Sequence, residues 1–275
     1  MSNLIIPILK ALQADPAIVK LAEGHSIPYI GGLFKVHHEY FYPFPPVLLP
    51  IFVDDGNPSV TGLLKHWFLD RDTTIVKYDL ETGIFSEKAR NGKQFIADLL
   101  LRMDILKDGL TPDIIQFAQD MQYQDLQEID KHAVEYGDSP KDLYHLQVFA
   151  EDPPIDYAPD LQYYKGDFPA TYRLLNQKHL EKACSFEVPT DLATTIEVPA
   201  WMYANANKQL LFDKYLNNKE LDKAWLTLNS RGWLISDAIN ALNKLTIYNT
   251  DPLFIHIAEH YINGWRSSNR LHLKY

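Results

Sequence analysis

Residues 48–101 read LLPIFVDDGNPSVTGLLKHWFLDRDTTIVKYDLETGIFSEKARNGKQFIADLLL, and this stretch decides the fold. Clusters rich in Asp, Gly, Asn and Pro divide it into apolar runs of strand length, because these residues favour tight turns. The runs cover 47–53, 61–69 and 73–79, and a Glu-Thr-Gly turn follows at 81–83. Short apolar runs joined by such turns predict an antiparallel meander.

A helix is expected directly after these strands. Asn91 is a residue type that caps helix N-termini, and residues 94–100 return to helical spacing. The alternation at 74–78 indicates a strand with one packed and one solvated face. Together these features predict an α+β fold, with an antiparallel sheet flanked by helices and followed by a mostly helical C-terminal unit.

The same stretch carries a resemblance to a known family. A proline-centred strand at 49–51, an Asp-Gly turn, the run Lys65-His66-Trp67-Phe68, a strand at 75–78 and residues 87–96 follow in that order. This order resembles the SUKH superfamily, an α+β domain common among bacterial toxin-immunity proteins. The resemblance covers about a fifth of the chain and consists of core and turn residues, so it indicates a fold more than a function. What it implies is a protein that binds and neutralises a toxin.

Changes in composition divide the chain into three parts. We expect a SUKH-like α+β unit at 1–110, an acidic helix and Pro-rich connector at 111–168, and a helical unit at 169–275. The connector is placed by its prolines and its lack of periodicity. In the last unit, apolar residues with helical spacing predict helices at 169–184, 199–216, 220–228, 236–245 and 252–262.

The net charge of −10 arises in the middle of the chain, where residues 111–170 hold 3 Lys and Arg against 13 Asp and Glu. A negative field repels nucleic acids and anionic membranes and attracts basic proteins. We therefore expect no nucleic-acid or membrane partner. The single Cys184 excludes an intramolecular disulfide framework, and the chain has neither a membrane-length apolar run nor a basic leader, so a cytoplasmic location is expected.

Acidic and tyrosine side chains recur through this middle part. One interpretation is that they are simply the solvated side of helices, as most charged runs are. The alternative is a docking face for a basic protein toxin such as a nuclease, in which carboxylates steer the partner and tyrosines anchor it. The residues predicted to bind the partner are Asp120, Tyr123, Asp125, Glu128, Asp130, Glu135, Tyr136, Asp138, Asp142 and Tyr144.

One motif points to a different class of function. His256, Glu259 and His260 match the H-x-x-E-H pattern, in which two imidazoles one helical turn apart can bind zinc. No acidic residue follows His260 to supply a third ligand, and two polar histidines on a helix explain the pattern equally well. Nucleophile and phosphate-loop motifs are missing, so we expect a protein that is not an enzyme and needs no cofactor or metal. The alternatives are a metal-dependent hydrolase and a regulatory scaffold that binds another protein through residues 199–265.

Overall fold

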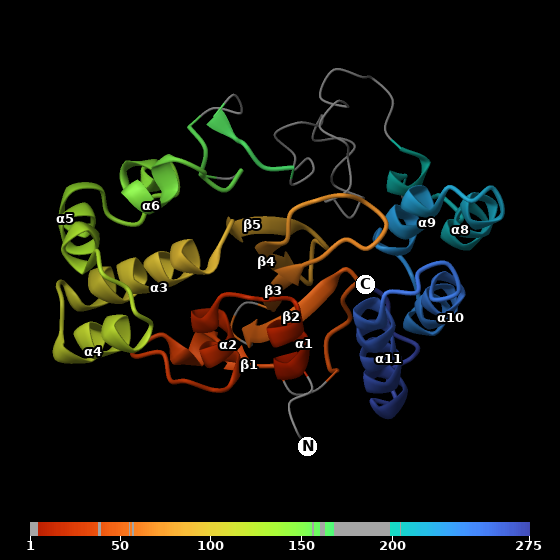
Figure 1. The fold of residues 1–275 in the computed structure, drawn as a ribbon, viewed down its shortest axis with the longest axis horizontal. Helices are drawn as coiled ribbons and strands as arrows, with labels where there is room; N and C mark the ends of the chain where they lie inside the picture. Colours follow the sequence, from red (N-terminus) through yellow and green to blue (C-terminus); the bar gives the residue numbers. More distant parts are fainter. Residues whose placement is uncertain are drawn as a thin grey trace.

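A computed structural model gives the fold of the chain (Figure 1). It describes residues 5–37, 40–54, 56, 58–155, 157–159, 163–167, 199–203 and 205–275. The helix expected at 169–184, with Cys184, lies outside these residues. Within the described ranges, no helix combines the length and the apolar character that crossing a bilayer requires.

Five antiparallel strands form one sheet, and they neighbour one another in the order in which they occur along the chain. Four of them come from the stretch that decides the fold: β2, β3 and β4 confirm the predicted antiparallel meander, and β5 is a further strand that was not predicted. The strands are β1 (Lys35–Val36), β2 (Leu48–Asp54), β3 (Ser59–Leu64), β4 (Thr74–Asp79) and β5 (Phe85–Ala89).

The strand predicted at 61–69 is too long, because β3 ends at Leu64. Trp67 and Phe68 instead pack on Phe254, and their ring centroids lie 5.5 and 5.4 Å from the Phe254 ring. Phe254 is about 190 positions further along the chain, and no local pattern reveals it. Aromatic packing therefore determines the path of residues 65–69.

Pro50 occupies an interior strand, where a residue without a backbone N–H is unusual. The register of β2 against β3 shifts between Pro50 and Phe52, which is the local irregularity that accommodates the proline. Gly62 lies opposite Pro50, and a Cβ added at Gly62 would be 2.1 Å from the carbonyl oxygen of Leu49. The close approach of the two strands thus requires glycine at this position.

Helices from the first part of the chain share one core with the sheet. Leu63 and Ile75 of the sheet belong to this core together with Leu99 of α3 (Gly92–Lys107). As predicted, α3 begins after Asn91, whose side chain accepts a hydrogen bond from the N–H of Gln94 at 3.0 Å. The other helices of this layer are α1 (Ile5–Ala11), α2 (Pro16–Ala22), α4 (Pro112–Asp120), α5 (Leu126–Tyr136) and α6 (Gln147–Ala150).

The C-terminal helices pack on the opposite face of the same sheet, and Figure 1 shows them on the other side of the strands from α3. Successive strand residues point to opposite faces. Accordingly Leu64 and Val76, which follow Leu63 and Ile75, belong to a second core with Trp225. The helices of this layer are α8 (Lys208–Asn217), α9 (Leu221–Leu228), α10 (Ile235–Leu245) and α11 (Pro252–Ser267).

This second layer corrects two expectations. Residues 74–78 were predicted to have a solvated face, but Val76 and Tyr78 are fully buried because the C-terminal helices cover that face. The helix predicted at 199–216 begins only at Lys208, where the Asn207 side chain caps it by accepting a hydrogen bond from Leu210 N–H. The α+β fold with a helical C-terminal part is confirmed.

Candidate protein-interaction surface

The acidic part of the chain forms α4, α5 and the short 3-10 helix η2 (Leu143–His145). The Thr111 side chain caps α4 by accepting a hydrogen bond from the N–H of Ile114. Apolar residues of both helices, such as Phe117 and Ile129, are buried in the first core. Polar side chains are consequently left on the outside, at the end of the molecule away from α10 and α11 (Figure 1).

A cluster of aromatic rings joins α5 to η2. Positions 128, 132, 135 and 136 recur at helical spacing and share one side of α5. Tyr136 stacks on His145 with ring centroids 4.4 Å apart and an interplanar angle of 14°. His132 lies 5.1 Å from Tyr136, and Tyr144 lies 4.0 Å from His145. We call His132, Tyr136, Tyr144 and His145 the ring cluster.

Three carboxylates, Glu128, Glu135 and Asp142, act electrostatically on this cluster, and we call them the acidic rim. Burial lowers the pKa of His132, with a smaller contribution from His145, while the rim acts in the opposite direction. A hydrogen bond to Glu135 is the main cause that raises the pKa of Tyr136. The fold therefore brings together five of the residues predicted from the sequence, namely Glu128, Glu135, Tyr136, Asp142 and Tyr144.

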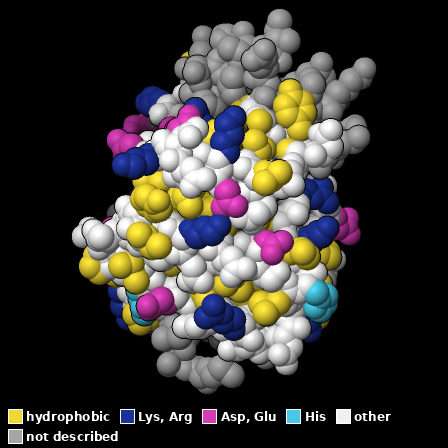
Figure 2. Space-filling view, turned by 90° about the vertical axis from the view of Figure 1, so that its right-hand side faces the viewer, with side chains coloured by type: hydrophobic (Ala, Val, Ile, Leu, Met, Phe, Trp, Pro, Cys, Tyr) yellow, Lys and Arg dark blue, Asp and Glu magenta, His cyan; other side chains and the backbone are white. Residues whose placement is uncertain are grey.

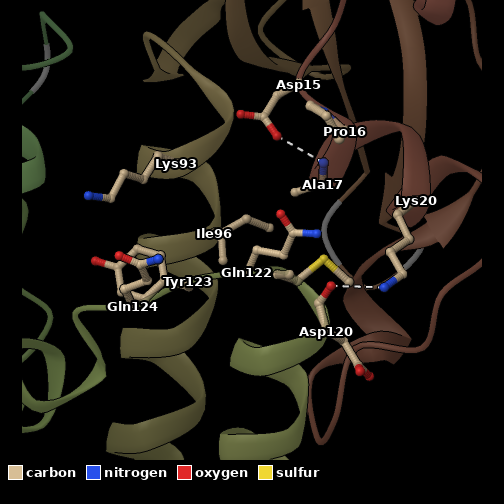
Figure 3. Close-up of a pocket in the computed structure, with 11 residues that line it drawn as sticks. Asp15, Pro16, Ala17, Lys20, Lys93, Ile96, Asp120, Gln122, Tyr123 and Gln124 are labelled. Carbon is tan, nitrogen blue, oxygen red and sulfur yellow. Dashed lines mark hydrogen bonds between the residues drawn. The ribbon is translucent and has the colours of Figure 1, made fainter.

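A cavity of about 350 Å³ lies beside this segment, between α2, the start of α3 and the turn after α4 (Figure 3). Its volume is in the range of small ligand pockets. The walls combine apolar and polar side chains: Asp15, Pro16, Ala17, Lys20, Lys93, Ile96, Asp120, Met121, Gln122, Tyr123 and Gln124.

Three predicted binding residues at or near this cavity already interact within the chain. His25 Nε2 lies 3.2 Å from Asp120 Oδ2, and Lys93 Nζ lies 2.9 Å from Asp125 Oδ2. Tyr123 is only 8% exposed, and burial raises the pKa of its hydroxyl. The structure thus leaves Tyr123 unable to act as a surface anchor, and each of the two carboxylates already has a basic side chain beside it.

The last two predicted residues, Asp130 and Asp138, influence side chains of α3. The negative charge of Asp130 contributes to the raised pKa of the buried Asp104 in α3. The charge of Asp138 contributes to the raised pKa of Arg102 in the same helix. The carboxylates of the acidic segment are therefore divided among several places. The acidic rim combines charge with the accessible aromatic surface of Tyr136 and His145.

Sequence reasoning missed the two histidines of the ring cluster. The spacing of four between His132 and Tyr136 is a signal that these rings share one side of a helix. His145 has no such signal, because α5 and η2 come together only through the loop at 137–142. Of the ring cluster, only His145 could accordingly not be found from the sequence.

The zinc-like motif lies on α11, away from the acidic segment. His256 and Glu259 are exposed, whereas His260 is partly buried against the Tyr40 ring at 5.8 Å. Burial and the neighbouring His256 lower the pKa of His260. Among the described residues, no three His, Cys, Asp or Glu side chains converge in a way that could hold a metal ion.

Comparison with known proteins identifies no relative of this chain. No protein-family model matches it, and no curated protein or solved structure matches it significantly. The proposal below therefore rests on the geometry and charge of the surface and on the sequence resemblance described above.

Proposed function

We propose that this protein is a non-catalytic immunity protein that binds and neutralises a basic bacterial toxin in the cytoplasm. The binding surface is the ring cluster with its acidic rim. The observation that carries the proposal is the position of the stacked Tyr136 and His145 rings at the surface, among carboxylates. The resemblance to the SUKH superfamily, which is common among toxin-immunity proteins, supports the same function.

The composition of this surface suits a protein partner. Nuclease toxins are basic because they bind phosphodiesters, so a negative surface accelerates their association and orients them. Aromatic side chains are enriched among residues that dominate binding energy. Tyr136 is 36% exposed, which adds apolar area next to the rim. A stable interface of this kind buries roughly 1,600 Å².

The side of the molecule formed by the C-terminal helices lacks this concentration of charge. Figure 2 shows Lys, Arg, Asp and Glu side chains interspersed there with hydrophobic ones. A surface of mixed sign gives little electrostatic preference for a basic partner. It therefore provides positions for matched control variants.

The product of the neighbouring gene is the partner to test, by co-purification and by protection of cells that express it. We expect Glu135→Lys and Asp142→Lys each to reduce its affinity roughly tenfold and to reduce protection, because a rim charge changes sign. We also expect binding to weaken as salt is added, since exposed charges are screened.

Asp222→Lys in α9 is the matched control, because it makes the same charge change on an exposed residue of the C-terminal helices. It should leave affinity and protection unchanged, and circular dichroism should show all three variants folded. Failure of the toxin to bind the native protein, or an equal loss with Asp222→Lys, would contradict the proposal.

A further inference from the structure

We infer that the ring cluster is a receptor for an arginine side chain of the partner. The inference rests on the proposed function and specifies the chemistry of its central contact. A guanidinium lies against the stacked rings and pairs with a carboxylate of the acidic rim. Both parts of this contact follow from the geometry of α5 and η2.

The first part is the flat ring surface. The Tyr136 and His145 rings are within 14° of parallel, and the Tyr144 ring lies 4.0 Å from the His145 ring at an interplanar angle of 36°. A planar, weakly hydrated guanidinium stacks on such rings, whereas an ammonium is a compact and strongly hydrated charge. Stacked aromatic rings at the surface therefore favour arginine over lysine.

The protein itself uses this contact elsewhere. Arg270 Cζ lies 3.7 Å from the centroid of the Phe41 ring, and Arg90 Cζ lies 5.6 Å from that of Tyr164. In the part of the chain that the structure describes, no lysine or arginine lies over Tyr136 or Tyr144. Because Tyr136 is 36% exposed and Tyr144 is half-buried, part of each side chain is open to a cation from outside.

The second part is the carboxylate partner. Glu135 is adjacent to Tyr136 and is the main cause of the raised pKa of its hydroxyl, and the charge of Asp142 acts on both Tyr136 and His132. An arginine on the rings can reach a carboxylate with its remaining N–H groups, and such pairs are often bidentate. The lowered pKa of the buried His132 favours its uncharged form, so it does not repel the incoming cation.

The probe is N-acetyl-arginine amide, titrated into the full-length protein while the ring signals of Tyr136, Tyr144 and His145 are followed by NMR. N-acetyl-lysine amide tests planarity, and N-acetyl-citrulline amide tests charge because it is planar but neutral. We expect arginine to bind roughly two- to fivefold more tightly than lysine, and citrulline to leave the signals unmoved. Equal shifts with lysine, or none with arginine, would overturn the inference.

Two tyrosine variants localise the binding. Tyr136→Leu should abolish the arginine-induced shifts at the remaining rings. Tyr248→Leu, at a tyrosine that is 46% exposed in the loop between α10 and α11, should leave them unchanged. An equal loss with both variants would overturn the inference.

The outcomes also separate this inference from the proposed function. Loss of arginine binding while the protein still neutralises its toxin overturns the inference alone. Arginine binding at the rings without any toxin partner supports the receptor site and overturns the proposed function.

Discussion

Asp104 shows how one residue can work against the stability of the protein. It is 1% exposed in α3, and within the described part of the chain neither carboxylate oxygen has a hydrogen-bond partner. Burial raises its pKa first, and the carboxylates of Asp130 and Asp108 add to this. Because its pKa is raised in the folded state, folding favours the protonated carboxyl. At a pH below the ordinary pKa of aspartate, the protonated Asp104 therefore contributes its full stability. This stability is lost as the pH rises through the raised pKa.

We predict that Asp104→Asn stabilises the protein at pH 7, because asparagine keeps the shape and cannot ionise. The expected gain is about 1 kcal/mol, which corresponds to roughly 2–4 °C in Tm. Thermal unfolding from pH 4 to pH 8 should show a smaller decrease in Tm with rising pH than in the native protein. Asp70→Asn, at an exposed turn, is the control and should leave the pH profile unchanged. A Tm for Asp104→Asn that falls at pH 7 would contradict this explanation.

At the scale of elements, a polar network fastens the segment after α6 to β5 and the start of α3. Glu87 is fully buried, and its Oε2 accepts a hydrogen bond from the N–H of Ile155 at 2.8 Å. Arg90 lies between Asp72 and Asp152, with N–O distances of 2.8 and 3.2 Å. Glu87 lies 3.4 Å from Arg90, so the buried carboxylate has a cation beside it. The network covers the outer edge of the sheet, where an unpaired strand would be exposed.

We predict that Arg90→Met destabilises the protein by about 3–5 kcal/mol, because it leaves Glu87 buried without its cation. Urea unfolding measures this loss, and limited proteolysis should cut within residues 151–167 sooner than in the native protein. Arg266→Met is the matched control, since it makes the same change at an exposed arginine in the last turn of α11. Equal stability losses in the two variants would show that the network does not hold the segment.

At the scale of the whole molecule, one sheet connects two cores. Leu99 lies in the core on the α3 side, and Leu242 lies in the core of the C-terminal helices. Side chains of neighbouring strand positions belong to different cores, so disruption of the sheet exposes both. The protein is therefore expected to unfold as one cooperative unit.

We predict that Leu99→Ala and Leu242→Ala each cost about 2–5 kcal/mol and shift every spectroscopic probe together. Tryptophan fluorescence reports largely on the second core, because Trp225, Trp233 and Trp265 are buried there. Far-UV circular dichroism reports on both layers of helices. Separate transitions for the two probes, or a Leu99→Ala variant whose fluorescence midpoint is unchanged, would show that the two cores unfold independently.

For the proposed site, the sequence shows which segment is acidic but not which side chains the fold brings together. Charge counting located the acidic segment, because an excess of carboxylates can be read from composition. It could not distinguish Asp120 from Asp142. Asp120 interacts with His25, which is far from it in the sequence, whereas Asp142 lies beside the stacked rings. Whether a carboxylate is neutralised depends on which bases the fold brings near it.

The sequence by itself determined the local features of this protein: the three-stranded meander of 48–79, the Asn91 cap of α3 and the acidic character of 111–170. Turn residues, capping side chains and charge act over a few positions, so their effects can be read along the chain. Only the tertiary structure decided that the C-terminal helices cover the second face of the sheet and that His145 stacks on Tyr136. Those contacts join residues far apart or across a loop, and packing selects them by the fit of whole surfaces, which no local pattern encodes.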